Sequence, residues 1–247
     1  MSSRRPSPLA AARGEPSYVW RDGQERRLRM IGQWSKLNSA AFLEAGCGMG
    51  AYSSQVRHRF SLDVEAFDLE FERVRAANVD TPHALVAAAE ALPYRSNLVD
   101  TILSNEVIEH VGDDRAAVAE MVRVLKPGGR IVLFCPNRWY PVEQHGHYWK
   151  GRYHFGNTPL INYLPDRWRN QLAPHVRTYT ARRIRHLFDG LPVRIIHHSR
   201  IFGGYDNIIR RYPHLGRWMR NTLYLLERTP FRFFGLSHLL VVEKTRQ

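Results

Sequence analysis

The chain has 247 residues, which is enough for one α/β domain with insertions, or for two small domains. Hydrophobic residues make up 44% of it and aromatic residues 11%, a globular composition, and no apolar run approaches the roughly 18 residues that a membrane-spanning helix needs. The formal net charge of +13 is segregated: residues 1–135 carry 17 basic and 17 acidic residues, whereas residues 136–247 carry 19 and 6. The whole excess therefore belongs to the C-terminal half.

The N-terminal residues are rich in Arg, Ser, Pro and Ala and lack the apolar segment of a signal peptide. We expect a disordered basic arm over residues 1–22, followed by a single domain over residues 23–247. The two cysteines, Cys47 and Cys135, do not make a disulfide framework, and a reducing cytoplasm is the expected location.

The first predicted elements surround a glycine-rich loop. Residues 23–37 have the apolar spacing of an amphipathic helix at the domain edge, and residues 40–43 are a short apolar run, read as a strand, that ends in the acid Glu44. Gly46, Gly48 and Gly50 follow on alternate positions, and residues 51–60 continue as a helix. Glycines let the backbone turn with positive φ and approach a ligand closely, and a helix start offers free N–H groups. The loop therefore predicts a nucleotide-cofactor site.

Two cofactor classes use such a loop. Gly46, Gly48 and Ala51 meet the G-x-G-x-x-G/A fingerprint of dinucleotide-binding folds, with Asp68 at a suitable distance for a ribose hydroxyl. Glu44, two residues before the first glycine, favours the other class, because a carboxylate would repel a pyrophosphate and suits a cofactor that carries an ammonium group.

The remaining elements alternate between strands and helices. Strands are predicted at 62–69, 84–89, 99–104, 130–135, 193–201 and 237–243, and helices at 70–78, 115–125 and 180–188, with a turn at 126–129. Such alternation specifies right-handed crossovers and a parallel sheet with helices on both faces.

Four sequence blocks, in order, carry a resemblance to a known family. They are the glycine loop, Ala89–Tyr94 (AEALPY), Val99–Val111 (VDTILSNEVIEHV) and Leu125–Gly129 (LKPGG). Over residues 42–137 the chain resembles the class I S-adenosylmethionine-dependent methyltransferases of type 11, which include enzymes of ubiquinone and menaquinone biosynthesis. The resemblance implies a Rossmann-like α/β fold: a seven-stranded, mostly parallel sheet with an antiparallel last strand. Residues 136–179 and 202–235 would then be insertions that cover the substrate site.

The resemblance also implies roles in binding S-adenosylmethionine. The three glycines would contact the methionyl end, Glu44 its amino group, and Asp68 the ribose hydroxyls. Residues implied to contact the adenine or the sulfonium are Leu69, Ala89, Glu90 and Asn105. Ala88 departs from the family, which usually has an acid at this position for the adenine amino group.

Candidate catalytic groups follow the fourth and fifth predicted strands. Glu106, Glu109 and His110 form E-x-x-E-H, which the ubiquinone-pathway enzymes associate with a divalent metal, although these residues could equally cap a helix. Glu143, His145 and His147 follow the fifth strand, where an acceptor is expected. We predict Glu109, His110 and His145 as candidates for the catalytic role, with one imidazole acting as base or hydrogen-bond donor, and no bound metal.

The expected acceptor is a small molecule or lipid, such as a quinone or glycolipid, methylated on oxygen or carbon. The net charge of +13 keeps an RNA or other nucleic-acid substrate open as the alternative, with Cys135 as a conceivable nucleophile but more simply a buried strand residue. Arginines mixed with aromatics over residues 210–234 favour peripheral contact with an anionic membrane, although a helix packed on the domain would explain them too. An NAD(P)-binding oxidoreductase is disfavoured by Glu44 and the later blocks.

Overall fold

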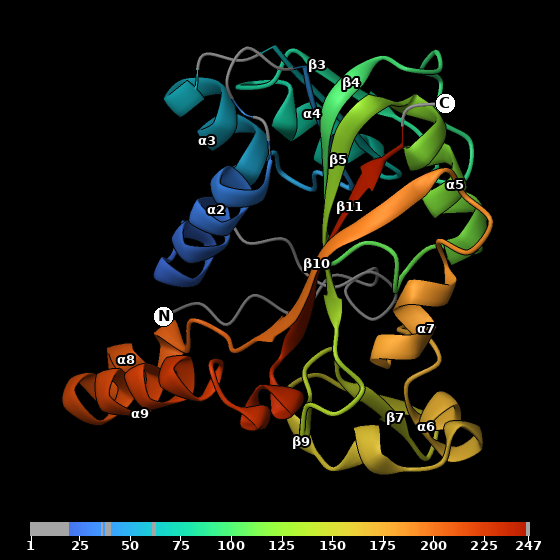
Figure 1. Ribbon diagram of the computed structural model, residues 1–247. Coiled ribbons are helices and arrows are strands. Elements are labelled where there is room, and N and C mark those ends of the chain that lie inside the picture. Colours follow the sequence, from blue (N-terminus) through green and yellow to red (C-terminus); the bar gives the residue numbers. More distant parts are fainter. Residues whose placement is uncertain (1–19, 36, 38–40, 61–62, 246–247) are drawn as a thin grey trace.

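The computed structural model describes residues 20–35, 37, 41–60 and 63–245 (Figure 1). Its main sheet has seven strands in the order β10-β11-β5-β4-β1-β2-β3. The strands are β1 (Phe42–Ala45), β2 (Val64–Asp68), β3 (His83–Val86), β4 (Val99–Asn105), β5 (Leu125–Pro136), β10 (Val193–Ile201) and β11 (Ser237–Lys244). Only β11 runs antiparallel to its neighbours, β5 and β10. The predicted fold class is confirmed.

Helices cover both faces of this sheet (Figure 1). They are α2 (Asp22–Trp34), α3 (Ala51–Phe60), α4 (Phe71–Ala77), α5 (Asp114–Val124) and α7 (Ala181–His186). On one face Leu28 and Ile31 of α2 and Val56 of α3 pack on the sheet, and on the other Met121 of α5 and Ile184 of α7 do so. Alternate strand residues supply the two cores, as the side-chain period of two requires.

The turn predicted at 126–129 lies inside β5 as an irregularity. Val99 pairs with Leu125 and Thr101 pairs with Arg130, so β5 advances by five residues over the length in which β4 advances by two. A Cβ atom at Gly129 would lie 2.9 Å from the carbonyl oxygen of Asp100, so this position requires glycine.

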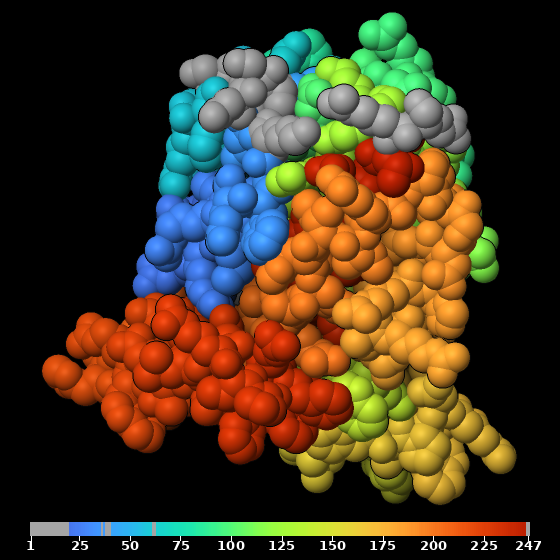
Figure 2. Space-filling model, viewed as in Figure 1, coloured from blue at the N-terminus to red at the C-terminus, as the bar shows by residue number. Residues whose placement is uncertain are grey.

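Both predicted insertions lie at the C-terminal end of the parallel strands, the lower end in Figure 1. The first contains β6 (Val142–Glu143), β7 (His147–Trp149), β8 (Arg152–His154), β9 (Thr158–Pro159), a 3-10 helix η1 (Ile161–Tyr163) and α6 (Asp166–Leu172). The second contains α8 (Asp206–Arg211), α9 (Pro213–Leu226) and the 3-10 helix η2 (Pro230–Phe234). The second insertion protrudes from the molecule in the space-filling view (Figure 2).

The predicted basic arm lies, up to residue 19, outside the described residues. Its last three residues belong to the folded part: the Trp20 ring meets the Tyr52 ring edge-on at 5.2 Å, and α2 begins at Asp22. Across the described ranges, every helix falls short of the length and apolar character that crossing a bilayer takes.

Candidate active site

The glycine loop leaves β1 at the C-terminal edge of the sheet. Gly46, Gly48 and Gly50 have φ angles of +63°, +54° and +76°. At Gly46 a Cβ atom would lie 2.6 Å from a methyl carbon of Val107. Both the positive φ angle and this close approach of the Val107 side chain therefore require glycine. The loop thus passes directly beside the segment that follows β4.

Asp68, the last residue of β2, holds this loop in place. Its Oδ2 atom accepts a hydrogen bond of 2.9 Å from the Gly48 N–H, and its Oδ1 atom accepts one of 3.0 Å from the Glu70 N–H. Each carboxylate oxygen keeps capacity for a further donor. The carboxylate is therefore fixed in orientation and able to accept from ribose hydroxyls.

A cavity of about 270 Å³ opens beside Asp68. Five of the residues predicted to bind the cofactor line it: Gly46, Asp68, Leu69, Ala89 and Glu90. Val107, His110 and Val111 line its other side. The structure thus brings together five predicted cofactor-binding residues that lie on three separate segments of the sequence.

Glu44 has a different neighbour from the one the resemblance implies. It is buried, and its carboxylate accepts hydrogen bonds from the Ser53 N–H at 2.7 Å and from the Ser53 hydroxyl. Burial raises the pKa of Glu44 to about 7, although the bonds from Ser53 oppose the shift. In the structure Glu44 therefore ties β1 to α3, and its contact with the cofactor amino group stays a prediction.

Arg27 is a site residue that the sequence reasoning missed. Its guanidinium donates to Asn105 Oδ1 at 2.6 Å and to Glu106 Oε1 at 2.8 Å, and it lies 4.9 Å from the centre of the Phe134 ring. Because Arg27 precedes the buried Ile31 by four residues, it lies on the buried face of α2. An arginine on the apolar face of a predicted helix is the signal that could have identified it.

Glu106 connects the cofactor side of the site to a second cavity. Its φ angle of +56° is uncommon for a residue other than glycine, and such strain is concentrated at functional sites. Burial alone would raise the pKa of Glu106, but the charge and hydrogen bond of Arg27 act against it, and the pKa lies below the ordinary value. Glu106 is thus a partly buried carboxylate whose charged form is favoured.

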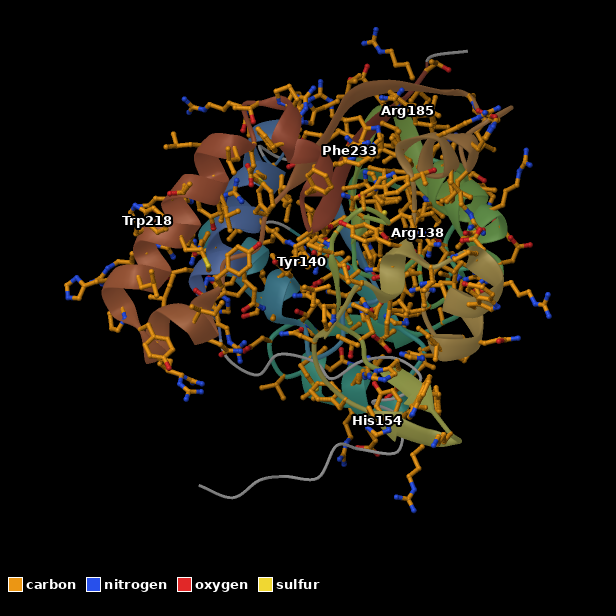
Figure 3. The ribbon with its side chains drawn as sticks, turned by 90° about the horizontal axis from the view of Figure 1, so that it is seen from below. Arg138, Tyr140, His154, Arg185, Trp218 and Phe233 are labelled. Atoms are coloured by element: carbon orange, nitrogen blue, oxygen red, sulfur yellow. The ribbon has the colours of Figure 1, made fainter. Side chains whose placement is uncertain are left out.

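The second cavity, of about 190 Å³, lies between the strand ends and the first insertion. Arg27 and Glu106 line it on the sheet side, and Tyr140, Gln144 and His145 line it on the insertion side. Tyr140 lies near the middle of the molecule in the view from below (Figure 3). Since Glu106 lines both cavities, the two are adjacent.

His145 is oriented by a buried ion pair. Its Nδ1 atom is 2.9 Å from Glu143 Oε1, and Glu143 Oε2 accepts a hydrogen bond of 3.0 Å from Arg169. Glu143 and Arg169 are each only 1% exposed. Burial would raise the pKa of Glu143, yet the bonds from His145 and the Arg169 charge lower it to about 2. An ionised Glu143 fixes the proton of neutral His145 on Nδ1 and leaves Nε2 free to accept one.

The three predicted catalytic residues converge. Glu109, His110 and His145 each offer a ligand atom, and these atoms lie within 4.8 Å of one another. His110 Nδ1 is 3.2 Å from the carbonyl oxygen of His175, and burial with the nearby His145 lowers the pKa of His110 to about 4. Burial and the neighbouring Glu106 raise the pKa of Glu109 well above the ordinary value. Two imidazoles and a carboxylate are a set that could hold a divalent cation.

Cys135, on β5, is fully buried, and burial raises the pKa of its thiol well above the ordinary value. A protonated thiol is not a nucleophile, so the interpretation of Cys135 as a buried strand residue is confirmed. Cys47 is also a free thiol.

Residues 43–133 match the family model described as a methyltransferase domain. Among curated relatives, the malonyl-[acyl-carrier protein] O-methyltransferase of Salmonella typhimurium is 38% identical over 119 residues, which cover 44% of this chain and 47% of the relative. The ubiquinone biosynthesis O-methyltransferase of Xanthomonas euvesicatoria is 32% identical over 123 residues, covering 45% and 49%. The chain thus spans about half the length of these relatives.

Solved structures share the fold over most of the chain. An S-adenosylmethionine-dependent methyltransferase from Mesorhizobium loti has a TM-score of 0.63 at 17% identity, covering 90% of this chain and 98% of that one. Geranyl diphosphate C-methyltransferase from Streptomyces coelicolor has a TM-score of 0.60 at 17% identity, covering 90% and 76%. Residues 43–133, with the glycine loop at their start, thus match the type-11 methyltransferase domain model, and the solved structures that share the fold include an S-adenosylmethionine-dependent methyltransferase.

Proposed function

We propose that this protein transfers a methyl group from S-adenosylmethionine to a small-molecule or lipid-type acceptor, on an oxygen atom deprotonated by His145. The observation that carries the proposal is the adjacency of two cavities at Glu106, which lines both of them. One holds the residues of the cofactor motif, and the other holds an imidazole oriented by a buried carboxylate. An acceptor bound beside His145 would lie next to the cofactor.

The groups that line the first cavity, and Arg27 bonded to Glu106 at its edge, suit S-adenosylmethionine. Asp68 would accept hydrogen bonds from the ribose hydroxyls, and Arg27 would attract the methionyl carboxylate from its place beside Asn105. The cofactor supplies, when bound, a methyl group already activated by the positive charge on sulfur. Ionised Glu106 is placed to complement that charge.

The chain's own contribution is to position the acceptor and to remove its proton. His145 donates Nδ1–H to Glu143, so Nε2 can take the proton of an acceptor hydroxyl. Glu143 then stabilises the imidazolium that forms, and Arg169 keeps Glu143 ionised. A carbon acid of low pKa could be deprotonated in the same way. The similarity to two enzymes named as O-methyltransferases supports an oxygen acceptor.

Calorimetric titration tests the cofactor assignment. We expect micromolar binding of S-adenosylmethionine and S-adenosylhomocysteine, weakened about tenfold or more by Asp68→Ala, because the ribose would lose two hydrogen bonds to a charged group. Glu72→Ala, an exposed carboxylate on α4, is the matched control and should leave affinity unchanged. Binding of NAD in place of the adenosyl compounds would overturn the proposal.

An acceptor screen tests the proposed class of methyl acceptor and the proposed role of His145. The protein would be incubated with methyl-labelled S-adenosylmethionine and separate lipid, small-metabolite and RNA fractions. Label in the lipid or metabolite fraction that disappears with His145→Gln supports the proposal. Label confined to RNA would support the nucleic-acid alternative.

A further inference from the structure

The second insertion presents an unusual surface, here called the α8–α9 hairpin and comprising residues 206–234. Gly216 is the only buried residue among the described residues of α8, α9 and η2. A Cβ atom at Gly216 would lie 2.7 Å from Ile209 Cα, which shows how closely α9 approaches α8. The two helices therefore pack on each other, and α9 also contacts α2, where Arg26 lies 3.7 Å from the centre of the Tyr224 ring and Arg220 pairs with Asp22.

The outer face of α9 is apolar. Leu215, Trp218, Thr222 and Leu225 are separated by three, four and three residues, which places them on one stripe of the helix. Leu215 is 60% exposed, Trp218 67% and Leu225 64%. Trp218 lies on the outer side of the hairpin in Figure 3. Phe231 and Phe234 of η2 are also exposed and extend the apolar surface.

The same hairpin is strongly basic. It carries six arginines and only two acidic residues, Asp206 and Glu227. Both acids face inward: Glu227 pairs with Arg26 and accepts from the Phe202 N–H at 2.7 Å, and Asp206 lies 3.3 Å from the Gly23 nitrogen. Their charges are therefore used to attach the hairpin to α2.

Five of the arginines lack such a partner. Within the described residues, none of the following forms an ion pair: Arg210, Arg211, Arg217, Arg228 and Arg232. They flank the exposed aromatic residues in the sequence, as Arg211 precedes Tyr212 and Arg217 precedes Trp218. The surface thus combines exposed apolar side chains with unpaired positive charge.

We propose that the α8–α9 hairpin is a membrane-contact surface that lies in the interface of an anionic bilayer. Leucine and tryptophan would enter the boundary between headgroups and acyl chains, and the arginines would pair with lipid phosphates. Charge complementarity selects an anionic lipid surface over a neutral one, and the apolar stripe distinguishes it from a purely electrostatic nucleic-acid site.

This contact would also place the active site at the membrane. Phe202, Gly204 and Asp206, at the base of the hairpin, line a cavity of about 250 Å³ together with Arg27 and Asn105. An acceptor presented by the bilayer is the natural substrate for such an arrangement, and this last step alone depends on the proposed function.

Vesicle co-sedimentation of the full chain tests the proposal. The vesicles are phosphatidylcholine alone, or phosphatidylcholine with about one third phosphatidylglycerol. We expect at least about tenfold tighter binding to the anionic vesicles, weakened by high salt. Replacing Leu215, Trp218 and Leu225 together by serine should reduce that binding about tenfold or more. Val79→Ser is the matched control, because Val79 is an apolar residue that is 82% exposed and follows α4, which lies at the opposite end of the molecule from the hairpin (Figure 1).

Two further measurements separate a loss of membrane contact from misfolding and test whether Trp218 enters the bilayer. Thermal unfolding and S-adenosylhomocysteine affinity should be unchanged in the triple variant, so that lost vesicle binding cannot be attributed to misfolding. Brominated lipid should quench Trp218 fluorescence, and the quenched component should vanish in Trp218→Phe. Vesicle binding without cofactor binding would sink the proposed function and leave the membrane contact standing.

The proposal is overturned if the triple variant binds anionic vesicles as well as the wild type does. It is also overturned if neutral vesicles bind equally, or if a single-stranded oligonucleotide binds more tightly through the same residues. Self-association that the triple variant abolishes, without vesicle binding, would identify a second copy of the chain as the partner.

Discussion

Arg27 on α2 donates a hydrogen bond of 2.8 Å to Glu106, which follows β4 and lies 79 positions later in the chain. The same guanidinium also bonds Asn105 at 2.6 Å. This contact fastens α2 to the C-terminal edge of the sheet at Glu106, where the cavity beside Asp68 meets the cavity beside His145. Several consequences of the site's geometry can be measured.

Arg27→Met should weaken S-adenosylhomocysteine binding about tenfold or more, because the cationic partner of the methionyl carboxylate is lost. It should also lower the free energy of unfolding by about 2 kcal/mol, since the partly buried Glu106 would lose its charged partner. Calorimetric titration and urea unfolding measure the two effects.

The double variant Arg27→Met with Glu106→Gln separates those effects. It should recover most of the lost stability, because no unpaired charge remains, but it should not recover cofactor affinity. Recovery of both would show that Arg27 acts only through the fold.

His145→Gln should lower kcat by about a hundredfold or more, because general base catalysis typically contributes that much. The affinity for S-adenosylhomocysteine should change little, since His145 lines the acceptor cavity and not the one beside Asp68. Initial rates with the acceptor found in the screen measure the effect. His154→Gln, on β8, is the control, and equal losses in both variants would argue against His145 as the base.

Glu44 should make stability depend on pH. Its pKa is about 7 in the folded protein against 4.5 in the unfolded chain, so unfolding releases a proton between these values. The contribution of Glu44 to the free energy of unfolding is therefore fully present below pH 4.5 and is lost as the pH rises to about 7. Above that pH the contribution of Glu44 no longer changes.

Comparison with Glu44→Gln isolates this contribution. The difference in free energy of unfolding, wild type minus variant, should fall by about 3 kcal/mol over that interval, as 1.36 kcal/mol corresponds to one pKa unit. Denaturant titrations at several pH values measure it, with Glu72→Gln as the exposed control. A difference that does not vary with pH would contradict a buried, protonated Glu44.

Treatment with a chelator should leave methyl transfer intact. Burial and the neighbouring Glu106 raise the pKa of Glu109 and so disfavour its charged form, and an uncharged carboxyl is a poor ligand beside His110 and His145. The rate before and after chelation measures this. If chelation abolishes the rate, a divalent cation restores it and Glu109→Gln does not respond to the cation, then the three residues form a metal site.

The sequence alone determined the strands and helices of the main domain and the cofactor motif, but not the elements inside the two insertions. The ranges predicted for α3 and β10 agree with the structure at both ends, and Asp68 was placed at a strand end near the glycine loop. These features depend on local patterns: helical or strand periodicity, and glycines at positions that require positive φ. Such patterns can be recognised without knowing what packs against them.

Tertiary structure alone decided which side chains meet. The Glu143 carboxylate contacts Arg169, 26 positions later, and Glu44 contacts Ser53 on the inner side of α3. Arg27 reaches Asn105 only because α2 packs on the sheet. Periodicity places a residue on a face but does not say which distant group lies opposite it, and burial of charged groups is stable only where such a partner is supplied.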